Sequence, residues 1–205
     1  MDFHYYLVDT TEEVLLAHYH STNLTINETA HSSLPSIANN SNFQQLDCLY
    51  SCLDSIKSWF DVFFGIPPAD YIGFPFSIFS QLSHCLTALY KLSSLKDSSW
   101  PSAEVRNTAD VLSILDMVIY NLAQVSALAG LDTSDMDEDI FTRTAKRFRS
   151  IKAGWEAKLD VDVVMATGAG LSVNTTPSYD LLEEFPEGDW TVDVWFSDIL
   201  MSMKT

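Results

Sequence analysis

Five side chains suited to holding or polarising a small molecule fall within a short stretch in the middle of the chain. They are Trp59, Tyr71, Gln81, His84 and Cys85. The last three share a segment whose apolar residues recur every three or four positions, which is the period of a helix. Interhelical spaces often form ligand pockets. We therefore predict that these five residues line an apolar cavity, with a satisfied buried histidine and a packed thiol as the alternative.

No familiar catalytic constellation accompanies them. His84 could transfer a proton, but the sequence identifies no partner for it. There is no Gly-x-Ser-x-Gly elbow and no P-loop, and the segment from Gly168 to Gly170 lacks the third glycine of a dinucleotide fingerprint. The acidic runs at 135–139 and 183–184 are typical of solvated faces. The sequence favours a protein without enzyme activity and without a cofactor, although a shaped apolar pocket can catalyse with few sequence signals.

The spacing of cysteines and histidines does not predict a metal site. Cys48 and Cys52 can share a helix face, but no further ligands lie nearby. His18 and His20 are two positions apart, so on a helix they point roughly 200° from each other. We expect one of these histidines to face the core and the other to face solvent.

The elements that would position these residues are all helical. Capping patterns and apolar periodicity predict five helices, near residues 10–27, 42–65, 75–92, 105–130 and 141–159. The segment 66–74 holds prolines and glycine but is apolar, so we expect a loop packed on the core. The predicted fold is an all-α bundle or array of about five to seven helices with an acidic C-terminal segment.

The residue composition of the chain changes after Leu159. Residues 161–170 are apolar and interrupted by glycine, which fits a strand-like segment or a packed loop. We therefore divide the chain into a helical domain at 1–160 and a linker with a C-terminal segment at 161–205, packed on the same domain.

The C-terminal segment interleaves large apolar residues with carboxylates. The apolar residues expected to contact a partner are Trp190, Trp195, Phe196, Ile199 and Leu200. Such alternation is typical of activation segments that fold against a partner's groove. The alternative is a last amphipathic helix, about 191–203, docked on the protein's own core.

The charge balance excludes simple nucleic-acid binding. The formal net charge is -17, from 28 acidic and 11 basic residues, and such a surface repels a phosphate backbone. The basic residues between Arg143 and Lys158 follow an acidic loop, so we expect them to pair within the chain.

Three cysteines and an N-terminus without signal-peptide features indicate an intracellular protein. The sequence contains no uninterrupted apolar run of about 20 residues, so we expect no membrane span.

Residues 63–92 carry a resemblance to a known family. They hold a proline-bearing loop, a tyrosine, a Phe-Pro-Phe turn, and a helix with Gln-Leu and Lys-Leu pairs. This pattern resembles the C-terminal part of the regulatory, middle homology region of fungal zinc-cluster transcription factors. The resemblance implies a nuclear regulatory domain that senses a small apolar effector and recruits transcriptional machinery through its acidic tail. That family reads DNA through six zinc-binding cysteines, whereas this chain has three at other spacings, so we expect no DNA binding of its own.

Two functional hypotheses follow. The first is the effector-sensing regulatory domain. The second is a stand-alone, cytoplasmic derivative that binds or converts an apolar metabolite in the same interhelical cavity, for example a cyclase or isomerase of secondary metabolism, that is, of natural-product biosynthesis.

Overall fold

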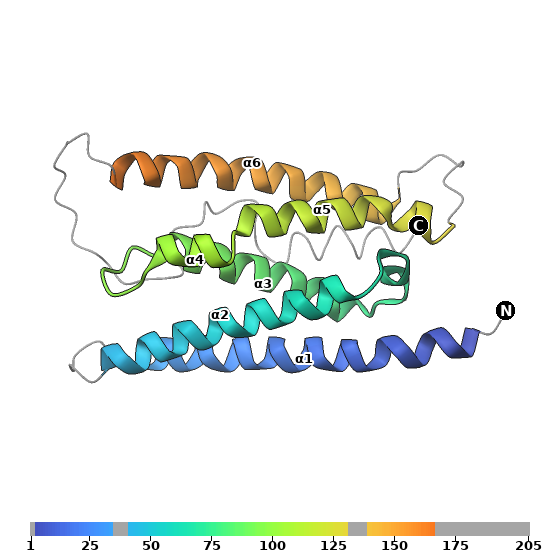
Figure 1. Ribbon diagram of the computed structural model, residues 1–205, viewed down its shortest axis with the longest axis horizontal. Helices are drawn as coiled ribbons and strands as arrows, with labels where there is room; N and C mark the ends of the chain where they lie inside the picture. Colours follow the sequence, from blue (N-terminus) through green and yellow to red (C-terminus); the bar gives the residue numbers. More distant parts are fainter. Residues whose placement is uncertain (1–2, 35–40, 131–138, 167–205) are drawn as a thin grey trace. The chain divides into compact units, whose positions relative to one another are not determined.

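The computed structural model describes residues 3–34, 41–130 and 139–166. Within these ranges all regular structure is helical, which confirms the all-α prediction (Figure 1). The elements are α1 (Phe3–Ser33), α2 (Ser41–Gly65), the 3-10 helix η1 (Pro68–Gly73), α3 (Phe76–Ser94), α4 (Ser102–Thr108), α5 (Val111–Leu128) and α6 (Ile140–Ala166).

The chain divides into two compact units, Met1–Lys152 and Ala153–Thr205. The first unit holds α1 to α5 and the first half of α6, and it contains every residue that positions the site. The division at residue 160 that the sequence suggested stays a prediction.

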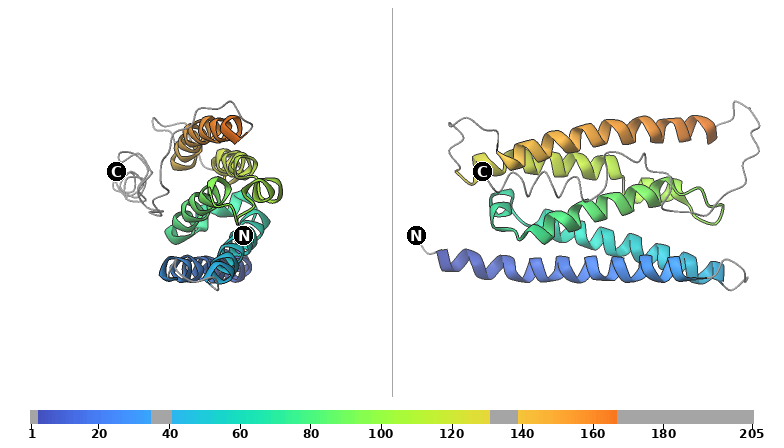
Figure 2. Two further views of the ribbon diagram at one scale, coloured as in Figure 1. Left: turned by 90° about the vertical axis from the view of Figure 1, so that its left-hand side faces the viewer. Right: turned by 180° about the vertical axis from the view of Figure 1, so that it is seen from behind.

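Helices α1 and α2 run antiparallel and pack along their length, as Figures 1 and 2 show. The inner face of α1 buries Ala17, Ser21 and Leu24, which follow one another at intervals of three and four residues. Helix α1 is longer than the predicted 10–27. The hydroxyls of Ser32 and Ser33 donate to carbonyls one turn earlier, so this polar sequence continues as helix beyond the predicted end at residue 27.

The core of the first unit is built from the apolar faces of α2, α3 and α5. Residues recur three or four apart on each, as predicted, and those with almost no exposed surface include Ile56, Trp59, Phe63, Leu82, Cys85, Leu86, Leu89, Val111, Leu115 and Leu122. Burial of this apolar surface is the main force that holds the helices together.

The apolar segment between α2 and α3 packs on the core, which confirms that prediction. It forms η1, which lies against α5. The Tyr71 ring is fully buried, with its centroid 4.9 Å from both Phe63 and Phe74. Its hydroxyl donates to the Phe63 carbonyl at 3.3 Å and accepts from Nδ2 of Asn121 at 3.1 Å. Burial raises the pKa of Tyr71 to about 12, against the lowering effect of the Asn121 bond.

The prediction of a single helix over 105–130 is wrong, because the helix is interrupted at residues 109 and 110. Ala109 leaves the helical region, with φ -145° and ψ 76°. Asp110 then caps α5, since its carboxylate accepts from the Leu112 backbone N–H at 3.2 Å and from the Ser113 hydroxyl at 2.5 Å. The apolar period runs through this break, and for that reason the sequence pattern concealed it.

Helix α6 begins within one residue of the predicted start but ends later than predicted. Asp139 accepts hydrogen bonds from the backbone N–H groups of Phe141 and Thr142 at its start. Burial raises the pKa of Asp139, but these bonds and those from side-chain hydroxyls, including Thr142, outweigh burial and leave it lowered. The helix continues to Ala166, so the strand or loop suggested from residue 161 is wrong as far as 166.

Residues Ser102–Leu128 are long and apolar enough to match a membrane-crossing helix by composition. In the structure they form two helices, and α5 buries Val111, Leu115, Val118 and Leu122 in the core. A core helix passes the same compositional test, so this match is weak evidence for a membrane span.

Candidate functional site

The candidate site is a polar seam where α1, α2 and α3 meet. The seam consists of His18 and Glu28 on α1, Trp59 on α2, and Gln81 and His84 on α3. These residues come from segments up to 63 positions apart in the chain. Only packing of the three helices therefore brings their polar atoms together.

Gln81 lies at the centre of the seam and bonds to both neighbouring helices. The indole Nε1–H of Trp59 donates to its Oε1 at 3.1 Å, and its Nε2 lies 2.5 Å from Nδ1 of His18. An indole N–H can only donate, so the Gln81 oxygen must face Trp59 and its NH₂ group must face His18. Nδ1 of His18 consequently accepts, and it carries no proton in this arrangement.

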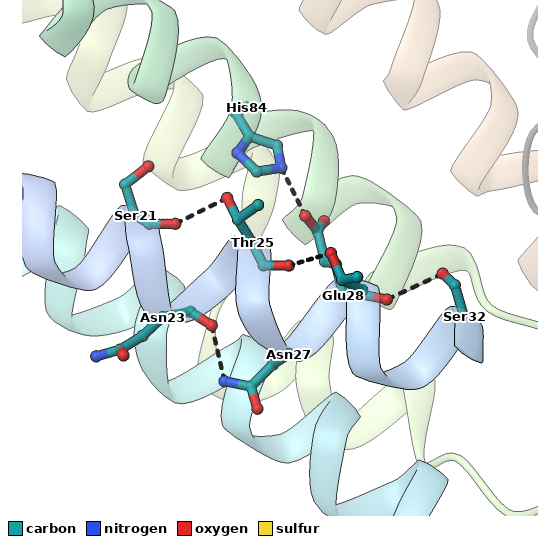
Figure 3. A network of polar contacts seen from close by, with 8 residues as sticks. Ser21, Asn23, Thr25, Asn27, Glu28, Ser32 and His84 are labelled. Carbon is teal, nitrogen blue, oxygen red and sulfur yellow. Dashed lines mark hydrogen bonds and ion pairs between the residues drawn. The ribbon is translucent and has the colours of Figure 1, made fainter. Parts of the chain in front are cut away.

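His84 and Glu28 form the second contact of the seam, drawn in Figure 3. Nε2 of His84 on α3 lies 2.7 Å from Oε2 of Glu28 on α1. Their side chains are 36% and 37% exposed. His84 is thus a satisfied histidine with a carboxylate partner, as the alternative to a pocket expected, but its side chain is half-buried and not fully buried. The thiol of Cys85 is packed, as that alternative expected.

Two buried thiols lie close to this ion pair. Cys85 has no exposed surface and Cys52 has 3%. Burial, followed by the negative charge of Glu28, raises the pKa of Cys85 far above its ordinary value. The same causes, with a further effect of Cys48, raise that of Cys52 to about 12. Both side chains are neutral thiols at physiological pH, which makes them poor nucleophiles.

The structure brings together only part of the predicted pocket. Trp59 and Gln81 bond directly, and Cys85 and His84 follow on the same helix. Tyr71 belongs to a different polar group with Asn121, although the Phe63 ring stacks on Trp59 and also contacts Tyr71. The proposal that these residues line a ligand cavity stays a prediction.

Sequence reasoning missed Glu28 as the partner of His84, and His18 as the partner of Gln81. A signal for Glu28 was present, because Ala17, Ser21, Leu24 and Glu28 follow at intervals of three and four and so share the inner face of α1. A carboxylate on a buried face calls for a partner. The sequence could not say which of the chain's histidines and basic residues would supply it.

His18 meets the expectation for the core-facing member of its pair, since it reaches Gln81 on α3. His20 is half-buried, with its ring edge-on to Tyr19 at 5.2 Å between centroids. In the part of the chain that the structure describes, no group of three His, Cys, Asp or Glu residues could hold a metal ion.

One basic residue of α6 pairs within the chain as expected. Nζ of Lys152 lies 2.7 Å from Oδ2 of Asp116 on α5. The predicted partner-binding residues Trp190, Trp195, Phe196, Ile199 and Leu200 lie outside the described residues.

Comparison with known proteins identifies the class to which this arrangement belongs. A family model, ATEG07667_C, described as a C-terminal domain, matches residues 68–205. The chain therefore belongs to this family of C-terminal domains. No solved structure matches the chain.

Two curated relatives are named as fungal transcription factors. The chain is 36% identical over 116 residues to "Transcription factor opdL" of Penicillium oxalicum, an alignment covering 57% of this chain and 20% of that protein. It is 30% identical over 207 residues to a "Transcription factor" of Aspergillus terreus, covering 92% of this chain and 35% of that protein. The chain thus spans between a fifth and about a third of its relatives' length. These findings confirm the resemblance to the regulatory region of fungal transcription factors.

Proposed function

We propose that this chain is an effector-sensing regulatory domain of a fungal transcription factor and makes no DNA contact of its own. The match of residues 68–205 to a C-terminal domain family, with relatives named as transcription factors, is the observation that carries the proposal. The net charge of -17 supports the absence of DNA contact. A transcriptional role places the protein in the nucleus.

The polar seam supplies the sensing element of this proposal. Gln81 joins α1, α2 and α3 through two hydrogen bonds, and the His84–Glu28 pair joins α1 and α3 again. A small apolar effector that inserts beside Trp59 and Tyr71 would compete with these bonds and shift α1 against α3. An effector acts by binding one arrangement of the helices better than another.

The acidic C-terminal segment supplies the output. Its apolar residues, Trp190 and Trp195 among them, would contact the transcriptional machinery in the manner of an amphipathic segment folding into a groove. Because the relatives are longer, DNA binding belongs in this proposal to sequence outside the 205 residues. The second hypothesis, a free-standing binder or enzyme, gains no supporting observation from the described residues.

A tethered reporter assay tests the proposal. The chain is fused to an unrelated DNA-binding domain, and reporter output is measured at equal expression. We expect activation that is lost with Trp195→Ala and Phe196→Ala together and kept with the matched polar changes Ser197→Ala and Ser202→Ala. An inactive fusion with the segment intact would remove the main support.

Effector sensing requires its own readout. We expect Gln81→Leu, which breaks the seam, to change reporter output or its response to fungal extract, while Gln44→Leu on the exposed face of α2 leaves both unchanged. Equal behaviour of the two variants would contradict sensing through the seam.

A further inference from the structure

The first half of α6 is rich in basic side chains and contains no carboxylate. Residues 140–155 hold five of the chain's 11 basic residues, which are Arg143, Lys146, Arg147, Arg149 and Lys152. One side of this helix packs inward, where Ala145, Phe148 and Ile151 are buried. Lys152 reaches Asp116 on α5. The other four basic residues form a surface that we call the basic face.

The basic face lies on the outward side of α6. Arg143, Lys146 and Arg149 follow at intervals of three residues and are exposed, and Arg147 is half-buried beside them. The four residues extend about 9 Å along the helix at 1.5 Å per residue. Cations at intervals of three and four residues repel one another and destabilise a helix. An anionic partner relieves this repulsion, so the face is suited to carboxylates.

A segment of the same chain has the complementary charge. Residues 180–198 hold seven carboxylates and no basic residue. The carboxylates are Asp180, Glu183, Glu184, Glu187, Asp189, Asp193 and Asp198. This acidic segment lies outside the described residues. A nucleic-acid backbone is a poorer candidate for the basic face, because the net charge of -17 repels it.

The length of chain after α6 lets the acidic segment return to the basic face. Helix α6 ends at Ala166. Arg149 and Arg143 lie about 26 and 35 Å before that end at 1.5 Å per residue. Residues 167–179 can span at most about 43 Å. A tether of this length gives an effective concentration on the order of millimolar, which favours this segment over a segment of another protein.

The acidic loop before α6 is a nearer source of carboxylates. Residues 132–138 hold four of them, and α6 begins at Ile140. These carboxylates are close in sequence to Arg143, whereas Arg149 lies about 13 Å beyond the start of the helix. The acidic segment has more carboxylates, so it matches the four cations of the face better than the loop does.

We propose that the acidic segment 180–198 folds back along α6 and binds the basic face through its carboxylates. The docking itself does not depend on the proposed function, but its consequence rests on it. The same segment supplies the output of the proposed regulatory domain, so docking would withhold its apolar residues from the transcriptional machinery. The basic face is then an autoinhibitory surface that competes with the partner for one segment.

Cross-linking of the purified full chain with a carbodiimide tests the docking, because this reagent joins a lysine amine to a carboxylate in contact with it. Mass spectrometry identifies the linked peptides. We expect Lys146 to be linked to carboxylates between residues 180 and 198. The yield should fall about threefold or more between about 50 mM and 500 mM salt, because salt screens exposed charges. Lys57, exposed on α2, is the control lysine and should give no such link.

A charge-reversed variant tests the role of the basic face. Arg143→Glu with Arg149→Glu leaves Lys146 in place and should lower its links to the acidic segment about fivefold or more, since like charges then face each other. Helix content should stay unchanged because both positions are exposed. Lys57→Glu with Lys96→Glu makes the same change in net charge at exposed positions elsewhere and should keep the links.

The tethered reporter tests the consequence. Arg143→Glu with Arg149→Glu should raise output about twofold or more at equal expression, because the released segment is available to its partner. The control pair at Lys57 and Lys96 should leave output unchanged. An inactive wild-type fusion that still shows the links would contradict the proposed function and leave the docking standing. Lost links without a rise in output would contradict autoinhibition.

Three results would overturn the docking itself. The first is a Lys146 that is linked only to residues 132–138, which would assign the basic face to the loop. The second is links that join two copies in a mixture of isotopically labelled and unlabelled chains, which would assign it to a second molecule. The third is links to the acidic segment that are absent at low salt or unchanged in the charge-reversed variant.

Discussion

His84 and Glu28 join α3 to α1 through a contact of 2.7 Å between Nε2 and Oε2, which is an ion pair when the imidazole is protonated, and each side chain keeps more than a third of its surface exposed. Solvent at such a site screens the charges and leaves a modest coupling. The pair therefore orients two helices that are distant in sequence without dominating the stability of the domain.

A double-mutant cycle with Glu28→Gln and His84→Gln measures this coupling. We expect about 0.2–1 kcal/mol at low ionic strength, which is typical of exposed pairs, and less at high salt. Chemical unfolding of the four proteins gives the value. Asp54→Asn, on the exposed face of α2, is a matched charge control, and a coupling well above 2 kcal/mol or independent of salt would contradict this description.

The variant Gln81→Leu should destabilise the domain more than its shape change suggests. It removes the acceptor of the Trp59 N–H, and Trp59 has no exposed surface. A buried donor without a partner costs about 1–3 kcal/mol. Thermal and chemical unfolding measure the loss, and Gln44→Leu on the exposed side of α2 should change stability by less than about 0.5 kcal/mol. Equal effects of the two variants would show that the bond contributes nothing.

The variant Asp110→Ala should cost about 1 kcal/mol, the usual value for a lost N-cap. Its carboxylate accepts from the Leu112 N–H and the Ser113 hydroxyl. Asp110→Asn keeps an oxygen that can accept from the Leu112 N–H but replaces the one that accepts from the Ser113 hydroxyl, so it should recover part of the loss. Amide hydrogen exchange in the first turn of α5 should rise in the alanine variant only. A variant that exchanges like the wild type would show that the break does not depend on the cap.

The two buried thiols should make the domain sensitive to alkaline pH. In the folded chain the pKa of Cys52 is raised to about 12 and that of Cys85 is raised further. Unfolded thiols ionise from about pH 9, so the unfolded state releases protons first and stability falls as the pH rises through that range. At pH 10 the loss is at most about 1.4 kcal/mol for each thiol.

Unfolding free energies measured from pH 8 to pH 10.5 check this expectation. A variant with both Cys52→Ala and Cys85→Ala should start from a lower stability and lose less of it over this range. Cys48, which is half-exposed, serves as the control position. Parallel pH profiles of the wild type and the double variant would contradict the argument.

The sequence predicted those parts of the fold that depend on local periodicity. The apolar spacing of α2 and α3 gave both helices, and the unusual apolarity around Tyr71 correctly indicated a packed connection. The interruption at Asp110 could not be predicted from apolar periodicity, because Val105, Ala109 and Leu112 keep helical spacing through it. The cap that starts α5 consists of only two hydrogen bonds to Asp110.

The candidate site was less predictable because its partners are distant in the chain. Gln81 and His84 were identified by type, but their partners on α1 lie 63 and 56 residues away. Pairing over such distances follows from the packing of whole helices, and a single sequence gives no direct measure of it. Glu28 was detectable only as a carboxylate on an otherwise buried face.

The hydroxyl and amide groups that bond within α1 bear on whether this helix is stable without the rest of the domain. Thr22, Thr25, Asn27, Thr29 and Ser32 each donate to a carbonyl four residues earlier, as Figure 3 shows for Thr25, Asn27 and Ser32. Residues of these types are weak helix formers on their own. A peptide of residues 3–33 should therefore be largely unstructured in water. The exposed outward face of α1 is thus an assembled surface, present when α2 and α3 are folded beneath it and lost when they are not.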